Sequence, residues 1–228
     1  PLLGGLWMIN NTLFFSVAIG FVRYLSDTYT TFEIAFFRQV LGVVLVSLWV
    51  WRAGLVALKT SVLHLHFVRA ILAYGGLVGS YYAVRLISIA DTQALQFTLP
   101  FFTFIFAAWT LNESIRAHRV VTTIVGFVGA LIIIRPGFVD ANFGMLIALG
   151  ASALFAGSDV TNRYLSGRDA VGTIMFYGFV IQLPIGLATS IPGWVTPSLA
   201  ELPVITVFAV SAVAAHWCLT HAFSVAET

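Results

Sequence analysis

The chain of 228 residues is 60% hydrophobic and only 9% charged, and its mean hydropathy is +0.98. The surface of a soluble domain needs far more charge than this, so the composition excludes a soluble protein and predicts one that lives in a bilayer. The net charge of +2 does not indicate a nucleic-acid partner, and the single cysteine, Cys218, can form neither an internal disulfide nor a zinc site.

Eight stretches are long and apolar enough to cross a membrane as helices, since a span needs about 20 apolar residues and its backbone must be satisfied internally. The predicted fold class is therefore all-α, a polytopic bundle of membrane helices. The spans lie at roughly residues 2–22, 33–51, 67–86, 91–111, 119–135, 144–162, 171–191 and 203–224.

The same unit is predicted to occur twice. The sequence Arg23–Ser26, at the end of the first span, recurs 140 residues later as Arg163–Ser166, at the end of the sixth. At the same offset, residues 34–37 resemble residues 174–177. Five spans in each copy would place the second copy upside down, and inverted repeats around a midplane site are typical of secondary transporters.

Pro136-Gly137 marks the boundary between the copies. We therefore expect a first five-helix repeat over residues 1–138 and a second, incomplete one over residues 139–228, containing helices six to eight and the start of the ninth.

The distribution of basic residues predicts the orientation. With a cytoplasmic amino terminus, the even-numbered connections hold seven basic residues and the odd-numbered ones three, as the positive-inside rule requires. The expected location is the inner (plasma) membrane. The seven are Arg52, Lys59, Arg69, Arg116, Arg119, Arg163 and Arg168, and the three are Arg23, Arg85 and Arg135.

Small residues at four-residue spacing are expected to let helix backbones approach closely in lipid. They include Gly75 and Gly79 in the third span, and Gly144, Ala148, Ser152 and Ala156 in the sixth.

Arg38 is the first candidate substrate contact, because it lies about five residues inside the second span and a charge there is costly. It could hold an anionic part of a substrate. The alternative is a structural role, in which Arg38 caps carbonyls or extends to the interface.

Aromatic residues are further candidates. At an offset of 136, Tyr81 corresponds to Trp217, and Arg85 corresponds to His221. Each copy would then bring a ring and a cationic group to equivalent places, which suits a flat or zwitterionic metabolite. Tyr and Trp also collect at membrane interfaces without a ligand.

The fourth span carries Gln93, Gln96 and Phe97 before Pro100. A proline cannot donate to the carbonyl four residues earlier, so Pro100 is expected to release the carbonyl of Gln96 and to form a polar contact or hinge. Pro184 would act similarly in the seventh span. A kink tolerated for packing is the competing interpretation.

The remaining candidates are Trp7, Asn10 and Asn11 in the first span as substrate contacts, and His216 and His221 as groups that couple transport to protons. Asparagine also cross-links helices, and a membrane histidine is often a packing residue.

Enzyme and channel functions are not favoured. The sequence lacks H-E-x-x-H, a serine elbow and a phosphate loop, and His64 and His66 are expected in a loop without acidic partners. Neither a metal nor another cofactor is predicted. Repeated carbonyl loops or charged rings, which channels use, are not seen either.

Several further motifs occur along the first repeat. They are Ala90-Asp91-Thr92-Gln93-Ala94, Pro100, Leu111-Asn112-Glu113, Gly126-Phe127-Val128-Gly129-Ala130, Arg135-Pro136-Gly137 and the arginine of Phe37-Arg38. Together they resemble the EamA-like drug/metabolite transporter superfamily. The family usually has a glycine where Asn112 precedes the glutamate.

The resemblance implies ten helices in two inverted repeats, of which this chain would contain eight, and a central cavity for a small metabolite such as an amino acid or cofactor-like compound. The expected function is a secondary transporter, an exporter or exchanger that works by alternating access. The alternative is a sensor or channel built on the same scaffold. The partners expected are the substrate and the bilayer; a homodimer is left open.

Overall fold

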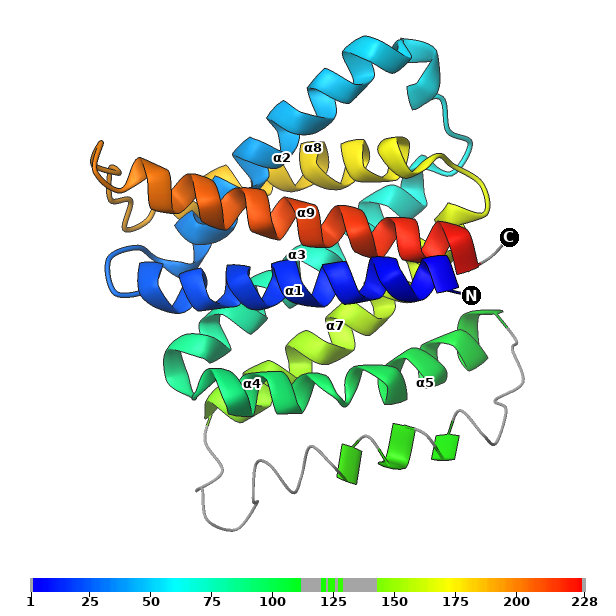
Figure 1. The fold of residues 1–228 in the computed structure, drawn as a ribbon, viewed down its shortest axis with the longest axis horizontal. Helices are drawn as coiled ribbons and strands as arrows, with labels where there is room; N and C mark the ends of the chain where they lie inside the picture. Colours follow the sequence, from blue (N-terminus) through cyan, green and yellow to red (C-terminus); the bar gives the residue numbers. More distant parts are fainter. Residues whose placement is uncertain (1, 112–119, 122, 126, 129–142, 227–228) are drawn as a thin grey trace. The chain divides into compact units, whose positions relative to one another are not determined.

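The computed structural model describes residues 2–111, 120–121, 123–125, 127–128 and 143–226, and every regular element among them is helical. Figure 1 shows these helices in chain order. Their bounds are α1 Leu2–Leu25, α2 Thr31–Ala53, the 3-10 helix η1 Leu55–Leu58, α3 Leu63–Leu86, α4 Ile89–Gln96, α5 Leu99–Leu111, α7 Phe143–Ser166, α8 Val171–Ser190 and α9 Leu202–Ala226.

Six of the described helices, α1, α2, α3, α7, α8 and α9, are long and apolar enough to cross a membrane. They confirm the predicted polytopic all-α class. The fourth predicted span is instead two helices, α4 and α5, separated at Phe97–Thr98. The fifth lies mostly outside the described residues.

Local sequence sets where α2 begins. Thr30 is extended, with φ −70° and ψ 155°, and its side chain accepts from the backbone N–H of Glu33. The Glu33 carboxylate in turn accepts from the backbone N–H of Thr30 at 2.8 Å. This reciprocal capping box starts the helix at Thr31, two residues before the predicted span.

The chain divides into two compact units, one made of residues up to Ile71 and from Thr161 onward, the other of Leu72–Val160. In the first unit, α1 packs along α9, and α2 packs against α8 and α9 (Figure 1). Val46, Met175, Phe179 and Val213 form its apolar core.

In the second unit, α3 packs against α7 through small residues. A Cβ atom added to Gly79 would lie 3.1 Å from that of Ala151, and Ala83, Ile87 and Ala148 form a buried cluster beside it. The small side chains therefore allow the two helix backbones to approach closely.

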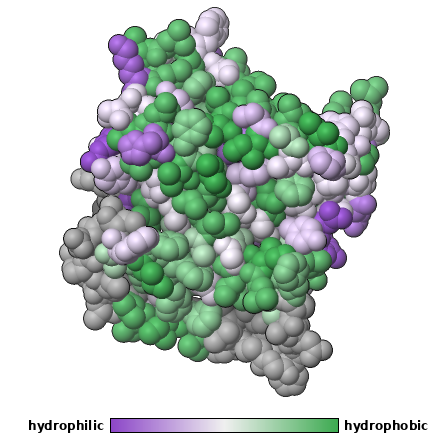
Figure 2. Space-filling view, turned by 180° about the vertical axis from the view of Figure 1, so that it is seen from behind, coloured by the Kyte–Doolittle hydropathy of each residue, from purple (hydrophilic) through white to green (hydrophobic). Residues whose placement is uncertain are grey.

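Large apolar side chains are exposed on the long helices. On α1 they include Leu6, Ile9 and Leu13, which are 56–61% exposed. Figure 2 shows apolar residues over much of the visible face, with polar residues in smaller groups. A surface of this kind is suited to contact with lipid tails.

Candidate functional site

A chain of polar contacts runs through the first unit from Arg38. The Arg38 side chain is buried, and its Nη1 donates to Oε1 of Gln39 at 3.4 Å. Nε2 of Gln39 donates to Oε1 of Gln182 at 2.6 Å, and Nε2 of Gln182 donates to the carbonyl of Ala70 at 3.0 Å. Because these residues belong to α2, α8 and α3, the amides tie three helices together in the interior.

A second buried arginine, Arg69, lies in the same unit and was not predicted as a site residue. It is on α3 and only 1% exposed, and its Nη2 donates to the carbonyl of Ile174 at 2.7 Å. A Cβ atom at Gly178 would lie 2.6 Å from this nitrogen, so the glycine leaves room for the guanidinium.

The assignment of Arg69 to a connection was therefore wrong. Helix α3 begins at Leu63, four residues earlier than the predicted span. The signal available in the sequence was a single arginine inside an otherwise apolar run.

The ring of Phe179 connects Arg38 to α9. The Arg38 guanidinium lies over this ring, 5.1 Å from its centre. On α9, the His216 ring meets Phe179 edge to face at 5.9 Å. Arg38 and His216 therefore contact the same ring, one over its face and the other at its edge.

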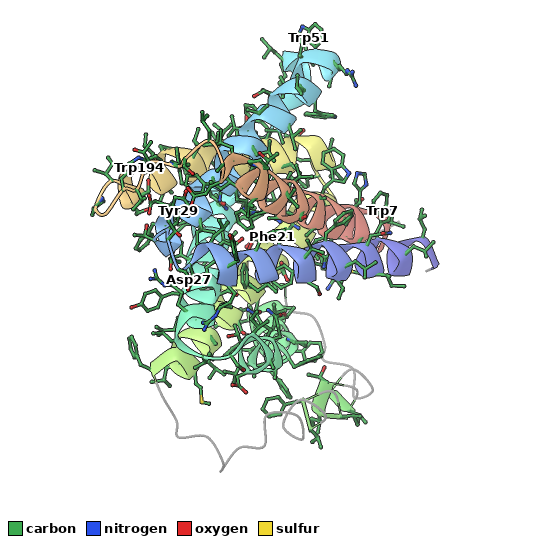
Figure 3. All side chains as sticks on the ribbon, turned by 60° about the vertical axis from the view of Figure 1, so that its left-hand side comes forward. Trp7, Phe21, Asp27, Tyr29, Trp51 and Trp194 are labelled. Atoms are coloured by element: carbon green, nitrogen blue, oxygen red, sulfur yellow. The ribbon has the colours of Figure 1, made fainter. Side chains whose placement is uncertain are left out.

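Three predicted aromatic candidates meet where α1 packs along α9. The Trp7 ring stacks on His221 at 4.9 Å with an interplanar angle of 17°, and Trp217 lies 5.2 Å from the same imidazole. Figure 3 shows Trp7 on α1 beside α9. The neighbouring Asn10 is exposed and donates to its own helix, at the Leu6 carbonyl, whereas Asn11 is half-buried.

The candidates of the second unit lie around the break between α4 and α5. Nε2 of Gln96 donates to Oγ of Ser80 at 3.3 Å, and Tyr81 is buried. Gln93 is half-buried, and its Nε2 has no hydrogen-bond partner among the described residues. Phe97, at the C-cap of α4, is 51% exposed.

The two prolines differ in their surroundings. Pro100 follows the break, where Thr98 donates both its backbone N–H and its Oγ to the carbonyl of Leu95, at 3.0 and 2.7 Å. Ser152 of α7 also donates to this carbonyl, at 3.3 Å. Pro184 is exposed inside the continuous helix α8. Only Pro100 therefore coincides with a break.

The expectation for His66 was wrong. This residue belongs to α3, is 0% exposed, and its Nε2 lies 2.8 Å from Oδ2 of Asp169. The partner is far away in sequence, so local composition gave no sign of it. Within the described ranges, no group of three or more His, Cys, Asp or Glu residues is arranged to hold a metal ion.

Comparison with known proteins gives consistent results. A family model, described as the EamA-like transporter family, matches residues 2–135. The S-adenosylmethionine uptake transporter of Rickettsia prowazekii is 29% identical over 97% of this chain and 75% of its own length.

Two further relatives are 32% identical. The riboflavin transporter of Brucella anthropi matches over 85% of this chain and 70% of its own. The pseudopaline exporter of Pseudomonas aeruginosa matches over 92% and 74%. One solved structure, described only as a crystal structure of a protein, has a TM-score of 0.63 and 14% identity, and the match covers 93% of this chain and 78% of that one. It shows a shared fold.

Proposed function

Since the chain belongs to the EamA-like transporter family, we propose that it is a secondary transporter of a small organic metabolite that works by alternating access. Its relatives are named for S-adenosylmethionine, riboflavin and pseudopaline, one for uptake and another for export. All three names denote organic metabolites, which supports this cargo class and leaves export, exchange and uptake as directions to be measured.

The observation that carries the mechanism is the reciprocal pairing of helices. If the sixth to eighth predicted spans repeat the first to third, then α7, α8 and α9 correspond to α1, α2 and α3. The contact of α1 with α9 then has its counterpart in the contact of α7 with α3, and α2 pairs with its own counterpart, α8. This pattern is what two inverted copies enclosing a shared site would produce.

The interior of the first unit supports particular roles in binding. Arg38 would bind a carboxylate or another anionic group of the substrate, with Arg69 strengthening the positive potential around it. Trp7 and Trp217 would offer flat surfaces to a ring. In the second unit, Gln93 and Gln96 would orient polar groups, Tyr81 and Phe97 would add ring surface, and Pro100 would act as a hinge.

His216 and His221 remain the candidates for proton coupling, because imidazole is the side chain that titrates near neutral pH. The proposed location is the inner membrane with the amino terminus in the cytoplasm. This orientation rests on the distribution of basic residues in the connections.

Flux into proteoliposomes tests the proposal, with S-adenosylmethionine, riboflavin and an amino-acid mixture as probes. Saturable flux is expected for a carrier. Flux that grows linearly with concentration would indicate a channel, and no flux of any probe would favour a sensor.

Arg38→Gln is the test variant, and Arg52→Gln is its matched control. Both residues are on α2, but Arg38 is buried and Arg52 is exposed. Arg38→Gln should raise the KM of an anionic probe about tenfold or more, the loss expected for one charged hydrogen bond. Arg52→Gln should leave the KM unchanged. Equal effects of the two substitutions would contradict the role of Arg38.

A further inference from the structure

At one end of the first unit, the start of α2 holds the connection between α8 and α9. The Tyr29 hydroxyl donates to Oε2 of Glu201 at 2.8 Å, and the backbone N–H of Val195 donates to Oε1 of Glu33. The Phe37 ring meets that of Trp194 at 6.1 Å. We name these contacts the α2 latch; they join Tyr29, Glu33 and Phe37 to Trp194, Val195 and Glu201.

The carboxylates of the α2 latch are well placed to accept hydrogen bonds. Glu33 is 0% exposed, and its second oxygen is fixed by the capping box of α2. Glu201 also accepts from the hydroxyl of Ser198 at 2.6 Å and from its backbone N–H at 3.1 Å. Because an ionised acceptor makes stronger hydrogen bonds, the latch is more than a surface contact.

At the start of α8, a second set of contacts holds the connection between α2 and α3. Oδ2 of Asp169 accepts from Oγ1 of Thr60 at 2.7 Å and lies 2.8 Å from Nε2 of His66. The hydroxyl of Thr173 donates to the carbonyl of Ala57 at 2.7 Å.

Tyr177 completes this second set. Its hydroxyl donates to the carbonyl of Leu58 at 2.8 Å, and its ring lies 4.8 Å from that of His66. We name these contacts the α8 latch; they join Asp169, Thr173 and Tyr177 to Ala57, Leu58, Thr60 and His66.

The two latches use equivalent positions of the proposed repeats. Asp169, Thr173 and Tyr177 lie 140 residues after Tyr29, Glu33 and Phe37. In each latch, three residues at four-residue spacing present one face to a connection supplied by the other copy. The chemistry differs between the latches, but the positions and the type of partner agree. Chance contacts would not be expected to repeat this register.

The latches lie at opposite ends of the first unit. Figure 1 shows the α1–α2 turn beside the α8–α9 connection at one end, and η1 near the α7–α8 connection at the other. Figure 3 shows Tyr29 and Trp194 at the same end. The structure holds both latches closed.

From this symmetry we propose that each latch is the clamp of one gate, so that releasing the α2 latch opens one side of the carrier and releasing the α8 latch opens the other. The inference rests on the proposed alternating access. A carrier must open to one side without opening to the other, and two separate clamps at opposite ends provide this independence.

Two nearly isosteric substitutions weaken the latches one at a time. Tyr29→Phe removes the hydroxyl that reaches Glu201, and Thr173→Val removes the hydroxyl that reaches Ala57. The matched controls are Tyr24→Phe, on an exposed residue of α1, and Thr206→Val, whose hydroxyl bonds within α9 to Leu202.

Reporter cysteines measure opening without a substrate. Cys218, the only cysteine, is replaced by alanine. Thr31→Cys places a thiol between Tyr29 and Glu33 of the α2 latch, at a residue that is 2% exposed. Val171→Cys is the equivalent position beside the α8 latch and is half-buried. The rate of labelling by a polar maleimide is measured for each reporter in proteoliposomes.

Tyr29→Phe should raise the labelling rate at Thr31→Cys about fivefold, the effect of losing one hydrogen bond, and leave Val171→Cys unchanged. Thr173→Val should do the reverse, and neither control should change either rate. An equal rise in the labelling rate at both reporters would show a general loosening of the fold. No rise at either reporter would show that the latches do not control the gates. Both outcomes would overturn the inference. If the protein carried no probe in the flux assay but the labelling remained specific to one side, only the proposed transport would be contradicted.

Discussion

The buried amides of Gln39 and Gln182 depend on each other for a hydrogen-bond partner. Both residues are buried, at 0% and 4% exposure, and their amides are 2.6 Å apart. Gln39→Met keeps the length of the side chain but leaves the Gln182 amide without this partner. We expect the free energy of unfolding to fall by about 1–3 kcal/mol, measured by detergent titration.

The double variant Gln39→Met/Gln182→Met is the control for this loss. In the double variant neither amide remains buried without the other, so the combined effect should be smaller than the sum of the two single effects. Additive losses would show that the amides do not interact.

Tyr29 gives the stability a predicted dependence on alkaline pH. Burial, followed by the hydrogen bond to Glu201, raises the pKa of Tyr29 to about 12 from its usual 10.0. The folded state thus favours the protonated phenol. Its contribution is fully present below pH 10, and it is lost as pH rises toward 12. The Tm in detergent should fall over this range, and Tyr29→Phe should reduce the fall, whereas Tyr24→Phe should not.

At acid pH the stability is expected to change in the opposite direction and to fall as the pH is lowered. The hydroxyl of Ser198 and then that of Tyr29 lower the pKa of Glu201 below its usual 4.5. The contribution of the carboxylate is present above that value and is lost as pH falls through the lowered pKa. A flat Tm profile in both ranges would contradict this account of the α2 latch.

Sequence reasoning found single residues better than it found their partners. It identified Trp7, Trp217 and His221 separately, but their contact depends on α1 packing along α9, more than 200 residues later in the chain. It missed the pairing of His66 with Asp169 and the depth of Arg69 for the same reason. Periodicity shows which face of a helix is polar, and only the packing shows what that face meets.

At the scale of helices, Gly42 controls the contact between α2 and α8. A Cβ atom at this position would overlap the ring of Phe179, which lies in the packed core. Gly42→Ala should therefore lower the free energy of unfolding by about 1–3 kcal/mol, as overpacking does. The measurement is the same detergent titration.

Gly186→Ala on α8 is the matched control, because its Cβ would lie at an ordinary contact distance of 3.6 Å from Phe36. It should change stability little. A similar loss at both positions would mean that helix flexibility, and not the close approach at Gly42, matters.

The presence of the six long helices was predicted well, and the positions of their ends less well. The apolar runs identify the six long helices, because a span must satisfy its own backbone. The ends depend on details such as the Thr30–Glu33 capping box, which extends α2 beyond its apolar run. The break at Phe97–Thr98 was signalled by Pro100, whereas Pro184 gave the same signal in a helix that continues.

For the whole molecule, the proposed inversion makes a prediction about sidedness. Asp27 and Gly167 are both exposed, lie 140 residues apart and occupy equivalent places in the two copies. With Cys218 replaced by alanine, a membrane-impermeant maleimide should label Asp27→Cys in intact spheroplasts. Gly167→Cys should react only after permeabilisation.

Labelling of both positions from the same side would rule out the inverted arrangement. Labelling of Gly167→Cys alone would keep the inversion and reverse the proposed orientation of the amino terminus.

The family was predictable because its motifs are local. The segment Ala90–Ala94, Pro100 and the glycines near Gly126 lie within the first 135 residues, where the family match also falls. Substrate identity has no comparable signature, since relatives of similar identity are named for different metabolites. The family motifs therefore do not identify the substrate.

The Glu33 carboxylate makes both a local contact and one that is distant in the sequence. One of its oxygens completes the first turn of α2, and the other receives the backbone of Val195, 162 residues further along the chain. Nucleation of the helix and anchoring of a remote loop thus share a single carboxylate. A replacement there would fray the helix and free the loop in one step, so neither property can be tuned without the other.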